Sequence, residues 1–210
     1  MRKRLSMLVL SCTLLASTSH AAPTDTVVPA GCEHDRTRLL ALDELQFDQD
    51  FTGGWRALAD RPGCKLAAAD LLRDYRQVHR NEAGILYWHE AQLRAMAGQI
   101  QPAIDLMEKS RETAGRDQGG WNAYVDASIA FLRRDRPALE QARKDLAAVP
   151  FPTDKGLPPL KNGVIDMPME GGKTMKMRWP PNIDVVDGFV ACFDKSYEDA
   201  YASACRPPLP

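Results

Sequence analysis

Three segments of the chain line up at a spacing of 35 residues, and this repeat limits what the chain can fold into. The segments cover residues 67–74, 102–109 and 137–144. In each, an alanine, an apolar residue and an acid follow one another, and another apolar residue comes three positions after the first. A period of this length indicates stacked helical hairpins, because one hairpin cannot bury its apolar face alone. Such arrays hold partners, and their repeats seldom carry out chemistry.

The first 21 residues have the pattern of a secretory signal peptide. Arginine and lysine open the chain, an apolar run covers residues 5–16, and small residues precede a cleavage point after Ala21. Cys12 lies in a segment that resembles a lipobox, but the apolar run continues past it, which favours cleavage over lipidation. The run is too short to span a bilayer, so no membrane insertion is expected after cleavage. The sequence therefore predicts a periplasmic or secreted protein.

The charge of the chain disfavours two classes of partner. The full sequence has 27 Lys and Arg residues against 28 Asp and Glu residues, a net charge of −1. Removing residues 1–21 removes three basic residues and no acids, which leaves a net charge of about −4 on the mature chain. A mildly acidic surface does not attract nucleic acids or anionic membranes.

Four cysteines remain after cleavage: Cys32, Cys64, Cys192 and Cys205. An even number in an exported chain predicts two disulfides, and four cysteines allow three pairings. We favour Cys32–Cys64 and Cys192–Cys205, because each pair brackets a local helical unit. A redox pair or a metal site is disfavoured, since the chain has no CxxC motif.

Amphipathic stripes predict helices through most of the chain after a linker over residues 22–33. Apolar residues recur at helical spacing, and glycine or proline separates the successive stripes. The expected helices lie at residues 33–47, 65–79, 81–97, 102–115, around 124–132, and 137–150.

Residues 34–150 resemble the tetratricopeptide repeat. Tyr124, Ala127 and Phe131 have the spacing of the first helix of that repeat, and Ala138 followed by Pro150 matches the second helix and its end. The resemblance implies antiparallel helical hairpins stacked as a short solenoid that binds a protein or peptide. Repeats of similar period occur in organellar RNA-binding proteins, but export and negative charge disfavour that family. The sequence departs from the repeat at Glu90 and Arg94, where an apolar residue and an aromatic residue are usual.

The register of the repeats places four residues on a candidate binding groove: Trp88, Gln92, Trp121 and Asn122. The alternative is that the two tryptophans pack between neighbouring helices. We expect a non-enzymatic protein without a cofactor, because the motifs that would indicate catalysis are incomplete. His89 and Glu90 begin like a zinc-protease helix, but Leu93 stands where the second histidine is required.

The last 60 residues have a different character. Residues 151–183 form a proline-rich connector with a possible β-hairpin around Gly171 and Gly172, in which Pro168 restricts its strand to an edge. The pattern of residues 184–210 predicts two short helices that a disulfide joins, followed by a tail. This pair could cap the open end of the helical array.

Four methionines gather within the connector: Met167, Met169, Met175 and Met177. They support a second hypothesis, a periplasmic Cu(I)-binding protein, because thioethers are soft ligands that select Cu(I). The simpler interpretation is that they pack the apolar face of the hairpin against the helices. The hairpin loop separates these cases: a two-residue loop puts the two methionine pairs on opposite faces, and a three-residue loop brings all four to one face.

Overall fold

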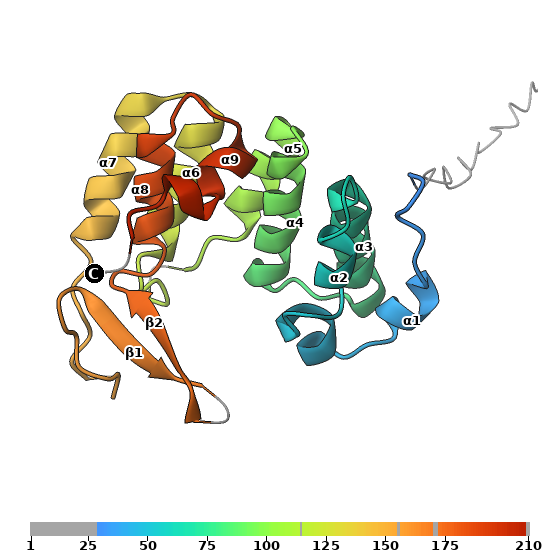
Figure 1. The fold of residues 1–210 in the computed structure, drawn as a ribbon, viewed down its shortest axis with the longest axis horizontal. Helices are drawn as coiled ribbons and strands as arrows, with labels where there is room; N and C mark the ends of the chain where they lie inside the picture. The colour runs from blue at the N-terminus through green and yellow to red at the C-terminus, as the bar shows by residue number, and fades with distance from the viewer. Residues whose placement is uncertain (1–28, 114, 155, 170–171, 209–210) are drawn as a thin grey trace, which may run out of the picture.

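The computed structural model of the chain describes residues 29–113, 115–154, 156–169 and 172–208. The predicted signal peptide and the first part of the predicted linker lie outside these ranges. The described chain is mainly helical, with one β-hairpin late in the sequence (Figure 1). Its helices are α1 (Arg36–Leu40), the π-helix η1 (Leu45–Gln49), α2 (Arg56–Ala59), α3 (Lys65–His79), α4 (Gly84–Met96), α5 (Ile100–Lys109), α6 (Trp121–Leu132), α7 (Arg136–Ala147), α8 (Ile183–Ala191), α9 (Tyr197–Tyr201) and the 3-10 turn η3 (Ser203–Cys205).

Helices that follow one another in sequence pack side by side, as the repeat predicts. The closest pairs are α3 with α4, α4 with α5, and α6 with α7 (Figure 1). Local signals set the helix starts: the carboxylate of Asp135 accepts the backbone N–H of Ala138 at 3.0 Å, and Pro137 lies in the first turn of α7. The prediction of a mainly helical chain with adjacent helix pairs is therefore confirmed.

The segment at residues 33–47 is not the single helix that its leucine stripe suggests. Helix α1 ends at Leu40, the chain turns, and the short π-helix η1 follows. Leu39 is buried, but Leu45 is 71 % exposed, so the stripe does not follow one buried face. The turn brings Phe47 and Asp48 into the protein, where both are fully buried.

Two apolar cores fill the part of the molecule that the structure describes, and α4 contributes to both. The N-terminal core gathers side chains from residue 32 to α4, including Leu86 and Leu93. The C-terminal core runs from α4 to α9 and includes Trp88, Ala91 and Ala95. Opposite sides of one helix therefore serve the two cores.

The predicted hairpin forms within the connector. Strands β1 (Val164–Pro168) and β2 (Thr174–Arg178) pair antiparallel, with Met167 opposite Met175 and Ile165 opposite Met177. The two strands contact each other far more than they contact any helix, and the hairpin extends away from the helical body (Figure 1).

The C-terminal helices fold back onto the helical array. Helix α8 packs on α7 and α6, and α9 packs on α8 and reaches α4. The ammonium group of Lys65, at the start of α3, lies 2.8 Å from a carboxylate oxygen of Glu198 in α9. The last helices therefore cover part of the face that α3 and α4 present, as well as the end of the array beside α7.

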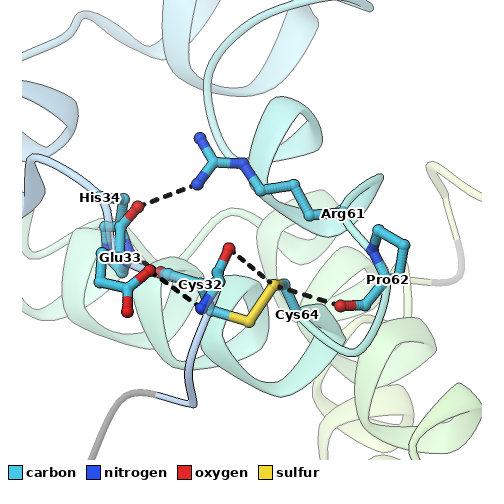
Figure 2. The surroundings of a disulfide bond; sticks show 7 residues. Cys32, Glu33, His34, Arg61, Pro62 and Cys64 are labelled. Atoms are coloured by element: carbon cyan, nitrogen blue, oxygen red, sulfur yellow. Dashed lines mark hydrogen bonds between the residues drawn. A yellow bond between two sulfur atoms is a disulfide. The ribbon is translucent and has the colours of Figure 1, made fainter.

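Both predicted disulfides form, Cys32–Cys64 and Cys192–Cys205. Figure 2 shows the first, which ties the segment before α1 to the start of α3; nearby, the guanidinium of Arg61 donates to the backbone carbonyl of Glu33 at 2.9 Å. Disulfides persist in oxidising surroundings, so the pairing indicates an extracytoplasmic compartment. Within the described residues, no helix is both long and apolar enough to cross a membrane.

Candidate functional site

A pocket of about 460 Å³ lies between the segment around α2, helix α4 and helix α9. We call it the inner pocket. One wall is formed by Phe51, Trp55 and Arg56, and the facing wall by His89, Gln92 and Met96 of α4. Tyr201 of α9 also lines it. Segments distant in sequence thus combine apolar, aromatic and hydrogen-bonding groups around one hollow.

The fully buried carboxylate of Asp48 contacts residues in both walls of the inner pocket. One oxygen of Asp48 accepts hydrogen bonds from Trp55 Nε1 at 2.8 Å and from His89 Nδ1 at 2.7 Å. The other oxygen accepts the side-chain amide of Gln49 at 2.5 Å, and Arg56 donates to the Asp48 backbone carbonyl. A buried carboxylate is costly unless it is paired in this way. Asp48 therefore joins both walls of the inner pocket.

The pKa of Asp48 follows from competing effects. Burial raises the pKa, but the hydrogen bond and the charge of His89, the hydrogen bond from Trp55 and the charge of Arg56 together outweigh burial. The result is a pKa below the ordinary value of 3.8. Asp48 therefore remains ionised at neutral pH despite its burial.

His89 is oriented by this carboxylate. Its Nδ1 faces Asp48, and its ring lies 5.2 Å from the ring of Trp55, centroid to centroid. A carboxylate that contacts Nδ1 fixes the orientation of the imidazole ring and leaves Nε2 available for a ligand in the pocket. The site can thus offer a hydrogen-bonding nitrogen at a fixed position.

The other side chains in the wall of the inner pocket are suited to binding a ligand rather than to catalysis. The guanidinium of Arg56 lies over the ring of Trp55 at 4.2 Å and over that of Phe51 at 5.6 Å. Phe51 is 75 % exposed at the pocket edge. Exposed aromatic and methionine side chains beside a few polar groups are typical of surfaces that bind other molecules.

The structure separates the four residues of the predicted groove. Gln92 lines the inner pocket. Trp88 is buried and packs against Trp121, with ring centroids 4.9 Å apart, so this pair contributes to packing between α4 and α6. Asn122 uses its side-chain amide to bind the backbone N–H and carbonyl of Glu112, which holds the loop before α6.

The two residues that depart from the repeat pattern belong to a buried ion network between α3 and α4. Glu90 accepts from Arg76 and, at 2.8 Å, from Arg94. Arg94 also donates to Asp70 at 2.9 Å. Burial lowers the pKa of Arg94, but its hydrogen bonds to Glu90 and Asp70 outweigh burial and raise it. Charged pairs thus replace apolar contacts at this interface.

A second pocket, of about 300 Å³, lies among α5, α6 and α7. Three of its charged groups are paired with one another: Arg111 bonds Asp126 at 2.7 Å and Glu108 at 2.5 Å. These ion pairs face solvent and resemble an ordinary hydrated surface. The inner pocket is therefore the stronger candidate site.

Comparison of the chain with protein-family models, with curated proteins and with solved structures found no match. The inner pocket is thus defined by its own residues alone. Asp48, Trp55 and Phe51 were not among the predicted site residues. The signal that could have pointed to them is an acidic and aromatic segment beside Gly53 and Gly54, because loops on a rigid scaffold often carry function.

Proposed function

We propose that the chain is a non-enzymatic, exported helical-repeat protein of the tetratricopeptide type that binds a protein or peptide segment in the inner pocket. The observation that carries the proposal is the pocket itself, with Phe51 exposed at its edge and His89 held in place by Asp48. The two disulfides and the signal-peptide pattern support a periplasmic or secreted location.

The packing of the C-terminal helices leaves room in the pocket for only a short segment of a ligand. Helix α9 lies against α4, and Tyr201 forms part of the pocket wall. The Lys65–Glu198 ion pair links α3 to α9 beside it. A ligand would therefore occupy the open part near Phe51, Arg56 and Gln92, where a few side chains of an extended segment would fit.

A photo-crosslinking pair tests the location of the site. A benzophenone amino acid at Gln92 should crosslink one dominant partner in living cells, because this side chain lines the pocket. The same group at Gln101, which is exposed on α5, serves as the matched control. Equal crosslinking from both positions would contradict the proposal.

Phe51→Ala tests the chemistry of the same site. Phe51 is largely exposed, so its removal should leave the melting temperature nearly unchanged. Binding of the crosslinked partner should weaken by at least about tenfold if the aromatic side chain contacts it. An unchanged affinity, measured by calorimetry with purified partner, would remove the pocket from consideration.

A further inference from the structure

We propose that the methionine face of the hairpin β1–β2 is a binding site for Cu(I), formed by Met167, Met169, Met175 and Met177. This site lies outside the helical repeats and does not depend on the proposed binding of a peptide. Register, exposure and ligand chemistry each contribute to the argument.

The register places all four methionines on one face. Met167 is directly opposite Met175, and the backbone N–H of Met169 donates to the carbonyl of Lys173 at 2.8 Å, so three residues form the loop. Directly opposite residues share a face of an antiparallel pair, and so do alternate residues along each strand. The three-residue loop is the case in which the methionines converge.

The spacing suits convergence on one ion. Cα atoms of opposite residues in an antiparallel pair lie about 4.5–5.5 Å apart. Alternate residues along a strand are separated by about 7 Å. A methionine side chain is unbranched and has three rotatable bonds, so thioether sulfurs from these positions can turn toward a common point. The Met167–Met175 pair forms the centre of the set.

Packing against the protein accounts for the base of this face but not for its outer part. Exposure rises from the base of the hairpin, where Ile165 is fully buried, toward the tip, where Met169 is 42 % exposed. Met177, opposite Ile165, is half-buried. In the central pair, Met167 is half-buried and Met175 is 47 % exposed. The strands extend from the helical body (Figure 1), so the methionines near the tip face solution rather than a helix.

The other face of the hairpin carries the buried Val164 at its base and mainly polar residues beyond it. Asp166 and Lys176 lie opposite each other and form an ion pair at 2.9 Å, and Thr174 is exposed beside them. The two faces therefore differ in chemistry, which is what a site built on one face requires. Lys173 shares the methionine face at the tip, where its charge would oppose a cation, so we place the ion nearer Met167, Met175 and Met177.

Ligand chemistry selects the ion. Thioethers are neutral and soft, and among biological metals they favour Cu(I). They need no deprotonation, so binding would release no proton from these groups. Calcium and magnesium prefer oxygen ligands, and zinc prefers nitrogen and thiolate ligands. The site should therefore take Cu(I), or Ag(I) as its redox-inert substitute, and reject the divalent ions.

The test is a titration of the full mature chain with Cu(I) against the chelator bicinchoninate, with Ag(I) as a second probe. Wild type should bind one ion per chain, and the variant with all four methionines changed to leucine should bind at least about tenfold more weakly. Met107→Leu, which alters a buried methionine of α5, should bind like wild type. Circular dichroism checks that each variant is folded.

A swap variant tests whether the position of the methionines on one face matters, rather than their number. Thr174→Met combined with Met175→Thr keeps the number of methionines but moves one to the polar face. It should lose affinity as Met175→Leu does. Lys173→Gln should bind more tightly than wild type, because a positive charge leaves the face. Equal affinity of wild type and the four-leucine variant, or no loss in the swap variant, would overturn the proposal.

Discussion

The N-terminal and C-terminal halves of the molecule are stabilised by different kinds of interaction. The interface between α3 and α4 contains a buried network of Glu90, Arg76 and Arg94, and the nearby Asp48 is buried as an ion. The C-terminal core instead packs aromatic rings, with the centroids of Phe131 and Phe189 4.8 Å apart. Charged contacts need every partner in place, whereas apolar contacts tolerate change better. Polar chemistry, and with it the inner pocket, therefore gathers in the N-terminal half.

Glu90→Ala should destabilise the folded protein more than any other variant below. Its removal leaves Arg76 buried without a carboxylate and Arg94 with Asp70 alone, which should lower the free energy of unfolding by about 3–5 kcal/mol. Glu140→Ala on α7, which breaks an exposed pair with Arg136, is the control and should cost less than about 0.5 kcal/mol. Similar losses for both variants in urea denaturation would show that burial does not distinguish the two pairs.

Removing each disulfide in turn compares how much each one stabilises its end of the chain. Cys32→Ser with Cys64→Ser opens a loop with a sequence separation of 32, and Cys192→Ser with Cys205→Ser opens one of 13. The chain-entropy model gives losses of about 3.7 and about 2.9 kcal/mol, respectively. Unfolding of the oxidised variants measures both. A larger loss for the C-terminal pair would mean that the clamp stabilises the folded contacts of α8 and η3 beyond its effect on the unfolded chain.

Asp48→Asn should reduce stability at neutral pH by about 2 kcal/mol, because charge-assisted hydrogen bonds from Trp55 and His89 become neutral ones. The pKa of Asp48 is lower in the folded chain than its ordinary value of 3.8. Its contribution is therefore fully present above about pH 4 and is lost as the pH falls below 3.8 toward the folded pKa. The difference between wild type and variant should shrink over that range. A constant difference down to pH 2 would contradict this account.

Tyr197→Phe should have the smallest effect and the opposite sign. The hydroxyl of Tyr197 is buried beside the side chains of Gln92 and Ser128 without a well-formed hydrogen bond to a described residue, while its ring packs 5.3 Å from that of Phe189. Removing an unsatisfied hydroxyl and keeping the ring should leave stability unchanged or raise it by up to about 1 kcal/mol. A loss above that size in thermal unfolding would show that the hydroxyl is satisfied.

Local features of this chain were predictable from sequence, and contacts between distant residues were not. The helix at Lys65–His79 was predicted with its bounds, because its apolar stripe is regular and a break precedes it. Both disulfides were predicted from the units they bracket. The Asp48–His89 contact joins residues 41 positions apart, and neither residue has a local pattern that indicates burial. Periodicity identifies faces of helices, but it does not show which polar residue a neighbouring helix will enclose.

Helix α4 has a consequence for how the protein loses its structure. Leu86 and Leu93 belong to the N-terminal core, and Trp88 and Ala91 belong to the C-terminal core, so neither core is complete without this one helix. Melting of α4 would remove packing surface from both halves at once. We therefore expect a single cooperative unfolding transition, with equal calorimetric and van't Hoff enthalpies, although neighbouring helix pairs could otherwise unfold stepwise from one end.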